Sequence, residues 1–277
     1  MSRQFLAIPC EGATLAATLD LPAGPLPTTA LLIVSGGNEL RSGAWAGQAR
    51  LAARMAKAGH AVLRFDRRGV GDSDGPNGGY RSSAPDIAAA LVALRAAVPG
   101  LEYIAAWGNC DGASALMLAQ GAGCDALILS NPWTFEEDGD STDEPAAEMP
   151  ATPMPAQALR AHYLARLANP AAIKRLLSGQ IPIKALAASL LGMMRPAAPP
   201  STLATDMAQG IASFTGPIAL LIADKDRTAQ AFLGGWNKRD PRLHICPGAS
   251  HSFVEPASQE WLAERVLEVL QEVKIKV

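Results

Sequence analysis

Short runs of branched apolar residues alternate with longer segments of helical spacing along most of the chain. The runs that indicate strands lie at 29–35, 61–65, 103–107, 126–130, 217–223 and 242–246. Helical spacing is found at 44–58, over Ile87–Val98 and over Trp261–Leu270. Buried strands separated by helices are typical of a mainly parallel sheet with helices on both faces. At 277 residues the chain is long enough for one large α/β domain of this kind.

The opening of the chain departs from this alternation. Two extended segments, 3–9 and 13–20, are separated only by Glu11 and Gly12. A connection this short favours a β-hairpin, and a hairpin beside parallel strands forms an antiparallel edge. We therefore expect a mixed sheet whose N-terminal edge is antiparallel.

The interval 132–212 interrupts the pattern with an acidic stretch, many prolines and helical segments. An insertion after the carboxyl end of a strand lies beside the crevice where such sheets bind ligands, so we expect a helical lid. Apolar residues such as Leu190 and Met193 favour a lid over the alternative, a small hairpin of helices that decorates the surface. The expected domains are an α/β core, 1–131 and 213–277, and a lid, 132–212.

The composition of the chain limits the classes of molecule that it is expected to bind. A net charge of −2 with 18% charged residues provides no basic patch for nucleic acid or anionic lipid. The sequence has neither an apolar leader nor an apolar run approaching the roughly 20 residues that cross a bilayer. We expect a cytoplasmic protein that acts on a small molecule.

Four cysteines are present without a CxxC pair, namely Cys10, Cys110, Cys124 and Cys246. This spacing disfavours a zinc site or a redox dithiol, and cytosolic thiols stay reduced. Neither H-x-H nor H-E-x-x-H occurs, so no metal or cofactor is expected.

Cys110 lies at the centre of the sharpest motif, Gly108-Asn109-Cys110-Asp111-Gly112. The motif follows the strand at 103–107 and precedes a helical pattern at 113–121. This is the G-x-nucleophile-x-G elbow with cysteine at the nucleophile position. Glycines are needed because the abrupt turn from strand to helix leaves no room for side chains two residues from the nucleophile. The unpaired amides at the start of the helix favour a thiolate and an oxyanion.

Asp111 follows the cysteine directly. Its carboxylate would oppose a thiolate if it pointed inward. We therefore expect it to face away from the thiol or to be held by a cation.

A cysteine nucleophile needs a base, and His251 follows the last predicted strand, where loops reach the carboxyl edge of the sheet. His60 precedes a strand, His244 lies within one and His162 falls in the expected lid. These three are interpreted as structural or solvated, although His162 could approach a substrate.

The base needs a carboxylate to orient its ring. Asp224 and Asp226 both follow the strand at 217–223. We prefer Asp226, the fourth residue of the loop pattern, and keep Asp224 as the alternative. The chain order nucleophile, acid, histidine is that of α/β-hydrolases.

Five segments together resemble the α/β-hydrolase superfamily over almost the whole chain. They are Ser35-Gly36-Gly37, the turn Asp66-Arg67-Arg68-Gly69-Val70-Gly71-Asp72-Ser73, the elbow, and the loops of Asp226 and His251. The resemblance implies that amides of Gly37 or Asn38 and of Asp111 form the oxyanion hole. It also implies that the turn serves as scaffold.

A narrower similarity joins Gly36-Gly37, Arg41-Ser42-Gly43, the elbow GNCDGASA and Asn131-Pro132-Trp133. These segments resemble the exosortase A system-associated hydrolases, hydrolase 1 type, which accompany bacterial exopolysaccharide and protein-sorting loci. Two positions depart from the superfamily norm. Cysteine replaces serine in the elbow, and Ser35 stands where histidine often precedes the oxyanion glycine.

These features predict an esterase- or thioesterase-like hydrolase that forms an acyl-cysteine. An acyltransferase, a lactone hydrolase similar to dienelactone hydrolase, and a catalytically silent binding protein remain alternatives. Candidate substrate contacts are Arg41, Trp133 and His162. For Arg41, a surface salt bridge is the alternative.

Overall fold

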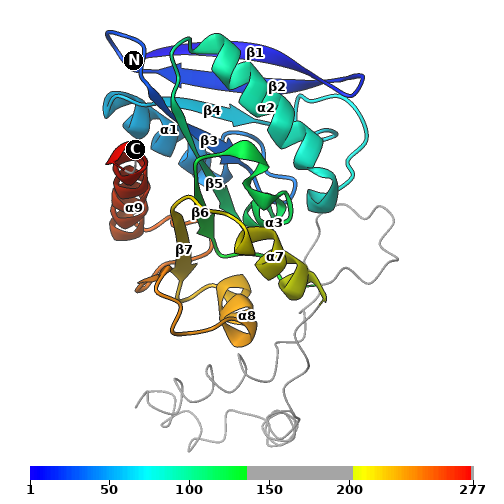
Figure 1. Cartoon of the computed structure of the whole chain (residues 1–277), viewed down its shortest axis with the longest axis vertical. Coiled ribbons are helices and arrows are strands. Elements are labelled where there is room, and N and C mark those ends of the chain that lie inside the picture. Colours follow the sequence, from blue (N-terminus) through cyan, green and yellow to red (C-terminus); the bar gives the residue numbers. More distant parts are fainter. Residues whose placement is uncertain (136–201, 276–277) are drawn as a thin grey trace, which may run out of the picture.

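The computed structural model describes residues 1–135 and 202–275. Within them the chain forms one eight-stranded sheet in the order β1-β2-β4-β3-β5-β6-β7-β8 (Figure 1). The strands are β1 (Ser2–Cys10), β2 (Ala13–Leu21), β3 (Thr29–Val34), β4 (Ala61–Phe65), β5 (Tyr103–Asn109), β6 (Ala126–Ser130), β7 (Ile218–Ala223) and β8 (Leu243–Cys246). The β1–β2 and β2–β4 pairs are antiparallel, and all other pairs are parallel. The predicted mixed sheet with an antiparallel N-terminal edge is confirmed.

The hairpin of β1 and β2 closes over the two residues that the sequence indicated. Cys10 pairs with Ala13, and Glu11 and Gly12 have φ angles of 46° and 83°. Two successive residues with positive φ give the turn whose twist matches that of antiparallel strands.

Helices cover both faces of the sheet. They are α1 (Gly47–Lys57), α2 (Ala84–Ala97), α3 (Asp111–Leu118), α7 (Thr202–Ala212), α8 (Arg227–Gly235) and α9 (Pro256–Ile275), with 3-10 turns η1 (Ala44–Ala46), η2 (Tyr80–Ser82) and η3 (Gln120–Gly123). One apolar cluster holds side chains of α1 and α9, which lie side by side, and the other holds side chains of α2, α3 and α7 (Figure 1). No helix in this part of the chain has the length and apolar composition to cross a membrane.

Two predicted boundaries move. The strand expected at 103–107 continues to Asn109, directly before the nucleophile position. The helix expected from residue 44 begins at Gly47, because Trp45 and Ala46 both have a φ of 55° and interrupt helical geometry.

Helix α7 falls within the span 132–212 that the sequence assigned to the lid. Its buried residues Leu203, Met207 and Ile211 nevertheless belong to the apolar cluster of the core. The core therefore resumes by residue 202 and not at residue 213, because these residues repeat at helical spacing and face α3.

Gly210 allows α7 to approach α3 closely. A Cβ at this position would lie 2.1 Å from the backbone oxygen of Met117. We expect Gly210→Ala to lower the free energy of unfolding by roughly 1–3 kcal/mol, since overpacking forces backbone shifts. Urea denaturation measures the change. Gly235→Ala is the control, because a Cβ there meets nothing within 4 Å. Equal stability of the two variants would show that α7 is not docked.

Candidate active site

Cys110 occupies a strained turn between β5 and α3. Its φ and ψ angles are 58° and −128°, a region that non-glycine residues rarely adopt. A Cβ at Gly108 would lie 2.6 Å from the Gly112 carbonyl group, and one at Gly112 would lie 2.4 Å from the oxygen of Val34. The glycines are required for the reason that the sequence suggested.

The backbone around Cys110 is held on both sides. Its amide donates to the Ser130 oxygen over 3.0 Å, and its carbonyl accepts from the amides of Ala113 and Trp133 over 3.1 and 3.3 Å. These bonds keep the strained conformation in place. Cys110 is partly exposed, whereas the other three cysteines are buried.

The structure brings Cys110, His251 and Asp226 together. His251, in the loop between β8 and α9, lies with its Nδ1 2.9 Å from Oδ2 of Asp226. Asp226 is buried and caps α8, where its carboxylate accepts from the amides of Thr228 and Ala229 over 3.3 and 3.0 Å. A carboxylate held by these amides fixes the orientation of the imidazole ring.

The second partner of the His251 side chain is the thiol of Cys110. Burial lowers the pKa of His251, but hydrogen bonds to Asp226 and to Cys110 outweigh it and raise the pKa to about 10. The contact with Asp226 therefore favours the protonated ring. An imidazolium beside the sulfur stabilises a thiolate.

The alternative acid, Asp224, has another contact. It is exposed, and its Oδ1 accepts the amide of Gly248 over 2.6 Å. This bond ties the loop after β7 to the loop that carries His251. Asp224 supports the loop, whereas Asp226 contacts the ring.

Two asparagines that the sequence analysis did not identify hold the His251 loop. The side-chain amides of Asn109 and Asn131 both donate to the His251 carbonyl, over 3.2 and 3.0 Å. Asn131 also bonds Asn109 and accepts the Ala223 amide over 2.8 Å. Asn109 is the last residue of β5 and Asn131 directly follows β6, at the edge where loops meet, and that position was the available signal.

The predicted oxyanion loop packs on the elbow. A Cβ at Gly36 would lie 2.4 Å from the oxygen of Asn109. The Gly37 amide donates to Oδ1 of Asp111 over 2.5 Å, and the Asp111 carboxylate also pairs with Arg67 over 3.4 Å. Arg67 is thus the cation expected beside Asp111. Asn38 is exposed, and its side chain bonds Asn77.

The candidate substrate contacts have different environments. Arg41 pairs with the buried Asp66 and with Asp72, so its guanidinium is engaged in the alternative role, a salt bridge. Trp133 lies beside the elbow, through its amide bond to Cys110 and its carbonyl bond with Ser114. His162 lies outside the described residues.

Asp66, Arg68 and Ser73 of the turn 66–73 contact other parts of the core. Besides Arg41, the buried Asp66 carboxylate accepts the Asp72 amide over 3.2 Å. Ser73 joins this turn to β2 through its bonds to the Asp66 carbonyl and the Ala16 amide. Arg68 pairs with the buried Asp86 and with the exposed Glu11.

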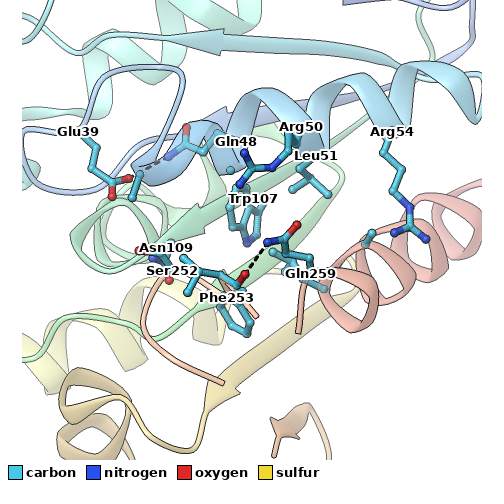
Figure 2. Close-up of a pocket in the computed structure, with 15 residues that line it drawn as sticks. Glu39, Gln48, Arg50, Leu51, Arg54, Trp107, Asn109, Ser252, Phe253 and Gln259 are labelled. Carbon is cyan, nitrogen blue, oxygen red and sulfur yellow. Dashed lines mark hydrogen bonds between the residues drawn. The ribbon is translucent and has the colours of Figure 1, made fainter. Parts of the chain in front are cut away.

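A cavity of about 100 Å³ opens beside these loops, between α1 and α9 (Figure 2). Leu51, Trp107 and Phe253 form its apolar wall, and Asn109, the residue before Cys110, borders it. Glu39 lies at one end (Figure 2).

Glu39 is positioned by a buried chain of side chains. Gln48 donates to its carboxylate over 3.2 Å and accepts from Ser35 over 2.8 Å. Ser35, which stands where histidine is common, thus supports the cavity through Gln48. Burial raises the pKa of Glu39, and the charge of His251 lowers it.

Within residues 1–135 and 202–275, no group of three or more His, Cys, Asp or Glu side chains could hold a metal ion. The reactive side chains that the structure brings together are the thiol of Cys110, the imidazole of His251 and the carboxylate of Asp226. Their arrangement suits nucleophilic attack with proton transfer by the ring.

The sheet, the elbow and the loop positions define an α/β-hydrolase. The model of the alpha/beta hydrolase family matches residues 31–265, so the chain belongs to this family. A comparison with curated proteins finds no match.

Solved structures share the fold at low identity. Est1E from Butyrivibrio proteoclasticus, with bound ferulic acid, is 19% identical with a TM-score of 0.59, over 96% of this chain and 99% of that one. The esterase PF2001 from Pyrococcus furiosus is 17% identical with a TM-score of 0.59, over 98% and 90% of the two chains. The alpha/beta hydrolase GrgF from Penicillium sp. sh18 is 18% identical with a TM-score of 0.60, over 99% and 100%.

The His251 pair gives a pH-dependent prediction. The pKa of His251 in the folded protein, about 10, lies above its ordinary value of 6.5. The contact of protonated His251 with Asp226 therefore stabilises the folded state fully below pH 6.5, and this stabilisation is lost as the pH rises toward 10. We expect Asp226→Asn to lower the pKa of His251, measured by NMR titration of the ring nitrogens. Asp224→Asn is the control and leaves that pKa unchanged. A larger drop in the Asp224 variant would contradict the assignment.

Proposed function

We propose that the protein hydrolyses ester or thioester bonds through a triad of Cys110, His251 and Asp226. The observation that carries the proposal is the strained elbow that presents Cys110 to an imidazole whose other nitrogen contacts a buried, amide-bound aspartate. The esterases among the similar folds support the same reaction class.

The reaction runs in two halves. The Cys110 thiolate attacks the carbonyl carbon, and the resulting oxyanion is bound by the Asp111 amide and by an amide of the loop at Gly37 and Asn38. His251 donates its proton to the departing alkoxide or thiolate, which leaves an acyl-cysteine. The neutral His251 ring then takes a proton from water, and the resulting hydroxide attacks the carbonyl carbon of the acyl-cysteine. The carbon–sulfur bond breaks, which releases the carboxylic acid and restores the Cys110 thiolate.

Acyl transfer to an acceptor other than water is the second form of the same chemistry. A thiolate is a better leaving group than an alkoxide, so an acyl-cysteine passes its acyl group readily to an alcohol or amine.

The similarity to exosortase A system-associated hydrolases supports a role in exopolysaccharide- or exosortase-linked metabolism. A cytoplasmic location and a lid formed by inserted residues that precede α7 belong to the same proposal.

Alkylation tests whether Cys110 is poised. Burial raises the pKa of Cys10, Cys124 and Cys246, for Cys124 to about 12, whereas Cys110 is partly exposed beside an imidazolium. We expect iodoacetamide at pH 7 to label Cys110 at least about 10-fold faster than the other three thiols. Mass spectrometry of the folded protein measures the rates. Uniform slow labelling would support the catalytically silent alternative.

Substitution of the nucleophile tests the reaction itself. Cys110→Ala is expected to lower kcat by at least about 1,000-fold, because the covalent intermediate can no longer form. The assay uses p-nitrophenyl esters, acyl-CoA thioesters and lactones, with and without an added alcohol acceptor. Lactone turnover alone would favour the dienelactone hydrolase-like alternative.

Cys246→Ala is the matched control, since this thiol is buried in the core between the sheet and α9. It should retain activity on whichever substrate is turned over. Full activity of Cys110→Ala on that substrate would exclude the triad.

A further inference from the structure

Both polar backbone groups of Gly37 are bound by charged side chains. The amide donates to Oδ1 of Asp111 over 2.5 Å, and the carbonyl accepts from the guanidinium of Arg67. The two side chains also contact each other, with Arg67 nitrogen 3.4 Å from either Asp111 oxygen. Residue 37 is therefore held from two sides by an ion pair.

This ion pair is shielded from water. The side chain of Arg67 is 6% exposed and that of Asp111 is 15% exposed. Arg67 is fixed further by a 3.1 Å bond to the hydroxyl of Ser83. Burying opposite charges is costly unless their hydrogen bonds are satisfied, and here the backbone of Gly37 supplies two of the partners.

The Asp111–Arg67 pair also limits which backbone amide of the loop after β3 can bind an oxyanion. Gly36 to Glu39 form a tight turn, in which the Glu39 amide donates to the Gly36 carbonyl over 3.1 Å and Gly37 has a φ of 53°. The Gly37 amide is bound to Asp111. Among the residues that the structure describes, the Asn38 amide has no hydrogen-bond acceptor. The Gly37 amide is thus engaged, whereas the Asn38 amide of this turn remains available to an oxyanion.

The positive charge of Arg67 also offsets the negative charge of Asp111 beside the sulfur of Cys110. The Asp111 carboxylate belongs to the residue next to the nucleophile, where a thiolate and then an oxyanion carry negative charge. An unpaired carboxylate would raise the energy of both. The adjacent guanidinium offsets that repulsion.

We propose that Asp111 and Arg67 are a positioning pair, which locks Gly37 so that the amides of Asn38 and Asp111 receive the oxyanion. The inference rests on the proposed acyl-cysteine chemistry and assigns a role to side chains that do not touch the reacting carbonyl. The carboxylate orients the loop, and the guanidinium orients the carboxylate.

Paired measurements on Asp111 variants test the role. Asp111→Ala removes the acceptor for the Gly37 amide, while Asp111→Asn keeps a side-chain oxygen that can accept it. We expect Asp111→Ala to lower kcat for ester hydrolysis by about 10- to 100-fold with KM little changed, because a misplaced donor stabilises the oxyanion less. Asp111→Asn should retain most of the activity.

The rate at which iodoacetamide alkylates Cys110 distinguishes a positioning role from a general disruption of the elbow. A general disruption would slow both alkylation and ester hydrolysis. Alkylation needs the thiolate and His251 but forms no oxyanion. In Asp111→Ala the alkylation rate of Cys110 should stay within about twofold of wild type or rise, since a nearby negative charge is removed. A parallel fall of alkylation and kcat would overturn the positioning role.

Arg67→Met tests the other member of the pair. It leaves the Asp111 carboxylate without its cation, so we expect a larger loss of kcat than in Asp111→Ala. The double variant Arg67→Met with Asp111→Asn should recover part of the loss, because the unpaired charge is gone. Additive losses would overturn the proposal that the two residues act as a pair.

Asn38→Pro removes the proposed donor amide, and Asn38→Ala is the matched control that keeps it. The φ angle of Asn38 is not positive, so the left-handed region that excludes proline is not occupied here. With thermal unfolding confirming a folded protein, we expect Asn38→Pro to lower kcat by about 100- to 1,000-fold and Asn38→Ala to have little effect. If Asn38→Pro does not fold, the Asp111 and Arg67 variants decide the question.

The outcomes separate this inference from the function on which it rests. An active Cys110→Ala enzyme would remove the acyl-cysteine mechanism. If Cys110→Ala is inactive while Asp111→Ala matches wild type, the mechanism stands and the positioning pair is wrong. A higher kcat in Asp111→Ala would show that the carboxylate blocks the oxyanion site.

Discussion

The structure of the site depends on one strained residue. Cys110 adopts backbone angles that an isolated chain would avoid, and bonds to Ser130, Ala113 and Trp133 keep it there. Those partners belong to β6, α3 and the segment after β6, so the packed sheet itself maintains the strain. A loosened sheet would release the elbow and withdraw the sulfur from His251.

Much of this arrangement could be predicted from the sequence. Apolar runs located the strands, and the spacing of Gly108 and Gly112 located the nucleophile position, because glycine spacing directly reflects steric limits. The partnership of His251 with Asp226 followed from the order of loops at one sheet edge. The roles assigned to these residues remain proposals, whereas the fold and their proximity are structural findings.

The parts that could not be predicted depend on contacts between distant segments. Arg67 was interpreted as part of a scaffold turn, and nothing local indicates that it reaches Gly37 and Asp111. Asn131 binds the carbonyl of a residue 120 positions away. Helix α7 was assigned to the insertion because prolines precede it, although its apolar spacing suits the core.

The division of the triad along the chain affects how the protein is made. Cys110 lies before the interval 136–201, whereas Asp226 and His251 lie after it, and Asn131 joins the two parts through Ala223 and the His251 carbonyl. During synthesis, the ribosome must extend the chain past residue 251 before the thiol can meet its base. If the proposed triad is right, the thiol therefore gains its base only after all eight strands have been synthesised.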